Sequence, residues 1–155
     1  PSGGSTTGSQ QRVINACYST PSPGAGLCAM WVSRVFSNAG YGYASGNAND
    51  MYNAWCYSSD RSALQPGMIV AVSTHSHTSA GRIYGHIGIY IGGGMIMENI
   101  GSITPRASTA GSATTAPRSP HAGAGSWESS WRRHGFRVSR PAWVPHPLAL
   151  VRRRR

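Results

Sequence analysis

The chain has 155 residues, of which 39% are hydrophobic, and a formal net charge of +10. This length suits one domain with one modest core, and no apolar run approaches the roughly 20 residues needed to cross a membrane. Residues 1–104 carry four arginines and three acidic residues, whereas residues 105–155 carry ten arginines and one glutamate. Because no apolar run is long enough, we expect no membrane insertion. Because the body of the chain is nearly neutral and does not interleave basic with aromatic residues, we expect no nucleic-acid partner.

The first part of the chain predicts a linker followed by two helices. Residues 1–9 are rich in Gly, Ser and Thr, which is typical of a flexible linker. Residues 10–18 place apolar side chains on one helical face and predict a short helix. Within residues 27–39, apolar side chains recur at spacings of three and four, and Gly40 provides a C-terminal stop. This segment gives the strongest helix signal in the chain, and Cys28 lies in its first turn.

The middle of the chain predicts a further short helix and then antiparallel strands. The helix is expected at residues 50–55, with Asn49 or Asp50 as its N-cap. Residues 92–94 are three glycines, which predict a hairpin turn. Strands are expected at residues 68–72, 86–91 and 95–100. Helices followed by a meander of antiparallel strands predict the α+β class, with N-terminal helices packed on an antiparallel sheet.

Residues 105–155 form an arginine-rich tail. They are rich in Ala, Ser, Pro and Gly and show no sustained period, which predicts a disordered or non-native segment and limits the folded domain to residues 10–104. The chain has fourteen arginines and no lysine, a bias typical of GC-rich DNA translated in an unintended frame. With suitable synonymous codons, another frame of residues 113–127 encodes YYGTTVTPRWGWVM, which is typical of a closing strand. Our hypothesis is that a frameshift between residues 103 and 112 removes the last strand and leaves an unpaired sheet edge.

Cys28 is the candidate nucleophile. The first turn of a helix has unpaired N–H groups and a partial positive charge, both of which favour a thiolate. The chain has two other cysteines, Cys17 and Cys56, so at least one of the three has no partner within the chain. Two arrangements remain open: three reduced thiols, or a Cys17–Cys56 disulfide that leaves Cys28 free.

His86 is the candidate partner of Cys28. It opens a strand in which three isoleucines alternate toward the core, and Gly88 on its own face leaves room beside the imidazole. If residues 92–94 form a three-residue loop, Gly88 pairs with Glu98, which then lies diagonally next to His86. If the loop has two residues, Asn99 takes that place instead. We prefer Glu98, because this register aligns two methionines with the isoleucines.

Two further histidines, His75 and His77, lie in a polar loop expected at residues 73–85. Their spacing allows both to face one side of an extended segment. A zinc site would need a third and a fourth ligand, and none stands out in the sequence. We therefore expect neither a metal site nor an organic cofactor.

Three runs of residues resemble the NlpC-type and CHAP-type papain-like cysteine peptidases of bacterial cell walls. These runs are GLCAMWVSRVFSNAG, LQPGMIVAV and GHIGIYIGGGMIMEN, and their order and spacing match that group over residues 13–100. The glycine-histidine run is the most specific of the three. The resemblance implies a papain-like fold and hydrolysis of peptide or amide bonds by a cysteine nucleophile.

The resemblance also implies roles for individual residues. Cys28 corresponds to the nucleophile, whose backbone N–H belongs to the oxyanion hole, His86 to the general base and Glu98 to the third polar residue. Tyr18 lies roughly where many members have an active-site tyrosine. The chain departs from the group where Leu27 precedes the cysteine in place of Asp, and where Met68 follows Pro-Gly in place of Asp. Because of these departures, the resemblance does not decide which bond the protein cuts. Both a bond within the stem peptide and the amide bond that links the peptide to the sugar stay open.

Together these features predict a peptidoglycan hydrolase that acts on wall stem peptides. The alternative is a catalytically inactive wall-binding relative with the same fold. We expect a monomer that is secreted or held in the cell wall. Because the chain begins at Pro1 rather than at methionine, we expect the export signal to lie outside this segment.

Overall fold

The computed structural model describes residues 7–43, 45–59, 62, 64–74, 78–100, 103–107 and 137–139. Within these ranges the helices are α1 (Gly8–Ser19), α2 (Cys28–Asn38), α3 (Ala48–Trp55) and α4 (Ser79–Tyr84). The strands are β1 (Cys56–Ser58), β2 (Ile69–Val72), β3 (His86–Gly92), β4 (Met95–Asn99), β5 (Ile103–Ala107) and β6 (Arg137–Ser139).

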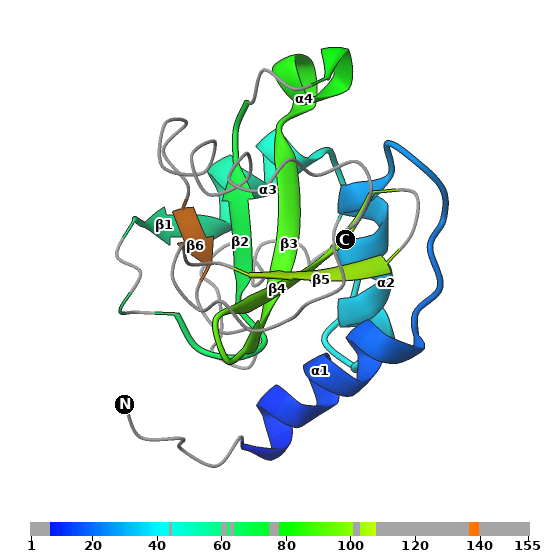
Figure 1. Cartoon of the computed structure of the whole chain (residues 1–155), viewed down its shortest axis with the longest axis vertical. Helices are drawn as coiled ribbons and strands as arrows, with labels where there is room; N and C mark the ends of the chain where they lie inside the picture. Colours follow the sequence, from blue (N-terminus) through cyan, green and yellow to red (C-terminus); the bar gives the residue numbers. More distant parts are fainter. Residues whose placement is uncertain are drawn as a thin grey trace, which may run out of the picture.

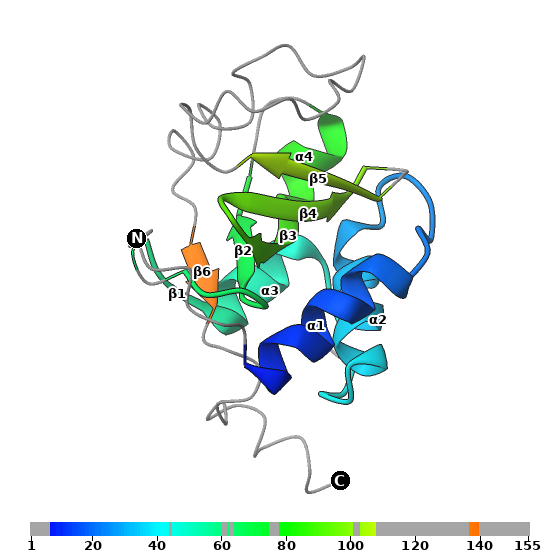
Figure 2. The same ribbon diagram turned by 60° about the horizontal axis from the view of Figure 1, so that its bottom comes forward.

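The strands form one antiparallel sheet in the order β1-β6-β2-β3-β4-β5. Helices α1, α2 and α3 gather on one side of this sheet, with α2 against β3 and α3 against β2 (Figures 1 and 2). The predicted α+β class, with N-terminal helices on an antiparallel sheet, is confirmed. Among the described helices, none is both long enough and apolar enough to span a bilayer.

Helix α1 begins earlier than the sequence predicts. The hydroxyl of Thr7 accepts a hydrogen bond from the N–H of Gln10 (3.3 Å), and the Gln10 side chain accepts one from the N–H of Thr7 (2.8 Å). This reciprocal capping fixes the helix start at Gly8. The expected linker is therefore wrong for residues 7–9, and residues 1–6 lie outside the described part of the chain.

The structure corrects two other expectations, the N-cap of α3 and the loop at residues 73–85. Helix α3 has Asn47 as its N-cap, and Asp50 acts from within the helix by accepting the N–H of Asn47 at 2.8 Å. Helix α4 lies inside residues 73–85, which were expected to form a loop. Its N-cap is Thr78, whose hydroxyl accepts the N–H of Gly81 at 2.9 Å.

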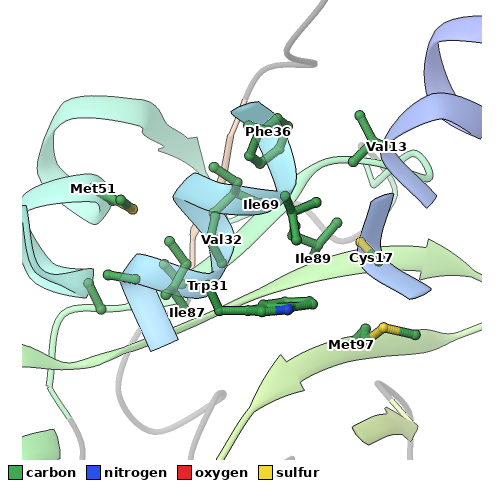
Figure 3. Packing of buried hydrophobic residues seen from close by; sticks show 14 of the residues in the cluster. Val13, Cys17, Trp31, Val32, Phe36, Met51, Ile69, Ile87, Ile89 and Met97 are labelled. Carbon is green, nitrogen blue, oxygen red and sulfur yellow. The ribbon is translucent and has the colours of Figure 1, made fainter. Parts of the chain in front are cut away.

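The main core lies between the helices and one face of the sheet. Trp31 of α2 is fully buried over the sheet (Figure 3), and its ring N–H donates to the carbonyl of Thr20 at 3.1 Å. Around it lie side chains from α1, α3 and the strands, among them Val13, Cys17, Met51, Ile69, Ile87, Ile89 and Met97. The predicted alternation of β3, with its isoleucines toward the core, is therefore confirmed. The opposite face of the sheet buries a smaller apolar cluster of Val70, Val72, Ile96 and Val138.

Strand β6 lies within residues 105–155, which were expected to form no regular structure. It lies between β1 and β2, with Val138 paired to Val70 and fully buried. The hydroxyl of Ser139 accepts the buried N–H of Ile69 at 2.9 Å, which holds the strand in register. A strand of three residues is too short to produce a recognisable period, which is why the sequence did not predict it.

Strand β5 likewise extends past the expected end of the domain, to Ala107. The expectation of a segment without structure is therefore wrong for residues 105–107 and 137–139. The other residues of the tail, and the expectations that concern them, lie outside the described ranges. The frameshift hypothesis stays a prediction.

Replacing Val138 with alanine tests whether β6 belongs to the folded domain. We expect Val138→Ala to lower the free energy of unfolding by about 1–3 kcal/mol, because it removes buried methyl groups and leaves a cavity. Urea unfolding followed by circular dichroism measures this, with Asn53→Ala on the exposed side of α3 as the control. Equal stability of Val138→Ala and the wild type would show that β6 is not packed in the sheet.

Candidate active site

Helix α2 places Cys28 at its first residue. The N-cap is Leu27, which has no side-chain oxygen, so no capping side chain occupies the N–H groups of the first turn. The thiol of Cys28 is partly exposed and receives hydrogen bonds from the backbone N–H groups of Ala29 and Ile87. The helix start thus points its partial positive charge at the sulfur, as the sequence predicted.

Strand β3 places His86 at its first residue, directly after Gly85. Gly85 has φ +72° and ψ −157°, a conformation that is essentially restricted to glycine. A Cβ atom there would lie 2.1 Å from the carbonyl oxygen of Val72. Glycine therefore lets the chain turn from α4 into β3 while passing close to the end of β2. This requirement explains the glycine that begins the glycine-histidine run.

Helix α4 is fixed to the body of the protein just before this turn. The side chain of Asn49 donates to the carbonyl of Ile83 at 3.1 Å, and the hydroxyl of Thr74 donates to the carbonyl of Arg82 at 3.0 Å. These bonds satisfy two carbonyl groups of the last helical turn. They also limit the movement of the backbone that leads into His86.

Glu98 of β4 contacts His86. Its Oε2 atom lies 2.9 Å from Nε2 of the imidazole, and only 1% of Glu98 and 8% of His86 are exposed. The pairing of Gly88 with Glu98 makes this contact possible. A Cβ atom at Gly88 would lie 2.7 Å from the side chain of Ile96 and 2.9 Å from the carbonyl oxygen of Met97. The glycine therefore allows the close approach of β4 on which the contact depends.

The register arises differently from the way the sequence suggested. Gly92 pairs with Met95, so the hairpin loop has two residues, and the preferred three-residue loop over residues 92–94 is wrong. The register then shifts between Tyr90 and Gly92, so that Ile91 is an extra residue on β3. This bulge restores the pairing of Gly88 with Glu98 that a three-residue loop would have produced.

Cys28 and His86 shift each other's pKa in opposite directions. Burial raises the pKa of the Cys28 thiol, but the hydrogen bond and charge of His86 and the two backbone N–H groups lower it below the ordinary value of 9.0. Burial lowers the pKa of His86, while Cys28 and Glu98, through hydrogen bonds and negative charge, raise it to about 9. Near neutral pH the site therefore favours a thiolate beside an imidazolium.

The other candidate residues lie elsewhere. The Asn99 side chain binds the segment before α2 and not the imidazole, with its Oδ1 atom 2.6 Å from Oγ of Ser22. Tyr18 lies at the last turn of α1 with 67% of its surface exposed, and the structure does not bring it into the contact of Cys28, His86 and Glu98. His75 and His77 lie outside the described residues. Within the described ranges, no group of three or more potential metal ligands occurs.

The three cysteines are all free thiols, so the Cys17–Cys56 disulfide is not formed. Burial raises the pKa of both Cys17 and Cys56 to about 12. Neither thiol is therefore a nucleophile near neutral pH. Cys28 is the one cysteine of the chain whose surroundings favour the thiolate.

Comparison with known proteins supports the fold. No family model matches the chain, and no curated protein sequence matches it. Among solved structures, NlpC1 and NlpC2 from Trichomonas vaginalis match with TM-scores of 0.50 and 0.51, each at 16% identity. The matches cover 63% and 64% of this chain and 38% and 41% of those structures, so the chain spans about two fifths of their length. The chain therefore has an NlpC-like fold, as its sequence resemblance implied.

Gly85→Ala tests the turn that positions His86. We expect it to lower the free energy of unfolding by about 1–3 kcal/mol and to slow alkylation of Cys28 at neutral pH, because a shift of β3 moves the imidazole away. Gly8→Ala is the control, since Gly8 has open space around it and lies at a helix start. Urea unfolding and iodoacetamide labelling measure both effects. A Gly85→Ala protein with wild-type stability and labelling would contradict this account of the turn.

Proposed function

We propose that this protein is a peptidoglycan hydrolase that cleaves peptide or amide bonds of bacterial cell wall by cysteine nucleophilic catalysis. The observation that carries the proposal is the contact between Cys28, at a helix N-terminus, and His86, whose other side is held by Glu98. This arrangement combines a nucleophile, a proton-transfer group and an orienting group. The wall substrate comes from the sequence resemblance to NlpC-type and CHAP-type peptidases.

The first half of the reaction forms a thioester. The Cys28 thiolate attacks the carbonyl carbon, and the negative charge moves to the carbonyl oxygen. The backbone N–H of Cys28, at the uncapped start of α2, is a donor for this oxyanion; such a donor typically contributes about 3 kcal/mol. The C–N bond then breaks, and the imidazolium of His86 gives its proton to the leaving amine.

The second half releases the product. Neutral His86 takes a proton from water, the resulting hydroxide attacks the thioester carbon, and the C–S bond breaks to give a carboxyl group and the thiolate. Glu98 orients the ring during both halves. Because Nε2 of His86 faces Glu98, Nδ1 is the nitrogen available to the sulfur and to the transferred proton. The chemistry needs no metal or organic cofactor.

The proposal also covers the oligomeric state, the location and the substrate of the protein. We propose that the protein acts as a monomer outside the cell or in the wall, on stem peptides of peptidoglycan. Both the stem-peptide bond and the amide link to the sugar fit the chemistry of the site. A catalytically inactive wall-binding relative remains the alternative, and the experiment below separates the two.

Digestion of purified peptidoglycan, with mass analysis of the released fragments, tests the proposal. We expect the wild type to release fragments with new amine and carboxyl ends, which also identify the bond that is cut. We expect Cys28→Ser to reduce release by roughly 1,000-fold or more, because the nucleophile is lost.

Cys56→Ala is the matched control, since that thiol is buried and has a raised pKa. It should retain activity. If folded wild type binds peptidoglycan but releases nothing, the hydrolase proposal fails and the inactive wall-binding protein is favoured.

A further inference from the structure

The segment that leads into α2, residues 20–27, has little structure of its own to fix its position. Gly24 and Gly26 have φ values of +122° and +76°, and most side chains of the segment are exposed or half-buried. Glycines with positive φ leave the backbone many alternative conformations. Leu27, the last residue of this lead-in segment, makes no capping bond with its side chain. The position of Cys28 therefore depends on contacts that the segment makes with the rest of the protein.

One set of contacts ties the beginning of the lead-in segment to α2 itself. The ring N–H of Trp31 donates to the carbonyl of Thr20 at 3.1 Å, and the side-chain amide of Asn38 donates to the hydroxyl of Thr20 at 2.9 Å. Thr20 is buried. These bonds fix one end of the segment but leave residues 21–26 to other partners.

The middle of the segment is held by Asn99 at the end of β4. The Asn99 side chain accepts a hydrogen bond from the hydroxyl of Ser22 (2.6 Å) and donates one to the carbonyl of Gly24 (2.8 Å). The Ser22 hydroxyl in turn accepts the N–H of Gly24 at 3.1 Å. Because the Gly24 carbonyl can only accept, the orientation of the Asn99 amide is determined. Only 1% of Asn99 is exposed, so water competes little for these bonds.

Neighbouring residues of a strand point to opposite faces, and β4 uses both faces at this place. Glu98 binds His86 on one face, and Asn99 binds the lead-in segment on the other. We propose that Asn99, together with Ser22, is a positioning residue that fixes the start of α2 and thereby holds Cys28 against His86. The catalytic importance of this role rests on the proposed function, whereas its effect on the thiol does not.

The test measures the rate of Cys28 alkylation by iodoacetamide as a function of pH, together with peptidoglycan digestion and urea unfolding. We expect Asn99→Ala to raise the alkylation midpoint, the pH at which the alkylation rate reaches half of its maximum, toward the value for an ordinary thiol. The reason is that Cys28 loses its fixed contact with His86. Turnover should fall by about tenfold or more, since misplacement by about 1 Å can cost on the order of 100-fold. The substrate KM should change little.

Two further variants isolate the hydrogen bonds. Ser22→Ala should raise the alkylation midpoint and lower turnover by less than Asn99→Ala does. The variant that carries both substitutions should change them by less than the sum of the two single variants, because both residues act through one contact. Ser22→Thr keeps the hydroxyl and should retain wild-type behaviour. Ser22 lies on the half-buried lead-in segment, so Ser22→Ala also tests the proposal if Asn99→Ala does not fold.

Val13→Ala is the control for lost stability alone, since Val13 is fully buried on α1 away from the site. It should unfold more easily with an unchanged alkylation midpoint. If Asn99→Ala or Ser22→Ala behaves in the same way, the residue is merely structural and the proposal is overturned. If the midpoint rises but the wild type digests no peptidoglycan, the positioning role stands and the proposed hydrolase function fails.

Discussion

A thiolate and an imidazolium in a largely buried site stabilise each other only while the backbone holds them in contact. Removing either charge from water is costly, and burial opposes the charged form of both Cys28 and His86. The site offsets this cost with directed hydrogen bonds: backbone N–H groups at the sulfur and the Glu98 carboxylate at the imidazole. The uncapped start of α2 lies at the sulfur of Cys28, and the glycine turn before β3 positions the imidazole of His86.

Strand β4 contacts both His86 and the segment that leads into α2. The bulge at Ile91 sets its register against β3, which places Glu98 on the face of His86 and Asn99 on the face of the lead-in segment. A shift of one residue would exchange the two faces, because side chains alternate along a strand. The carboxylate would then face the segment before α2, and the amide would face the imidazole. A single extra residue in the hairpin thus decides both contacts.

Much of this arrangement could be predicted from the sequence, because it follows from local patterns. Helical spacing places Cys28 in a first turn, and strand alternation separates His86 from the isoleucines. The preference for Glu98 reached the right pairing with Gly88 through the wrong loop length, since the bulge leaves no mark on an alternating run of apolar residues. The bond between Ser22 and Asn99 joins residues 77 positions apart, and β6 has three residues; neither produces a period that sequence analysis can detect.

The ring protonation of His86, followed by nuclear magnetic resonance titration of labelled histidines, tests the central claim most directly. The pKa of His86 is raised from the ordinary 6.5 to about 9, so protonation of His86 adds stability that is fully present below about pH 6.5 and is lost as the pH rises through about 9. We expect His86 to remain an imidazolium at pH 8, where exposed histidines are neutral, and its pKa to fall in Cys28→Ser. A His86 ring that is neutral at pH 8 in the folded wild type would contradict the thiolate–imidazolium pair.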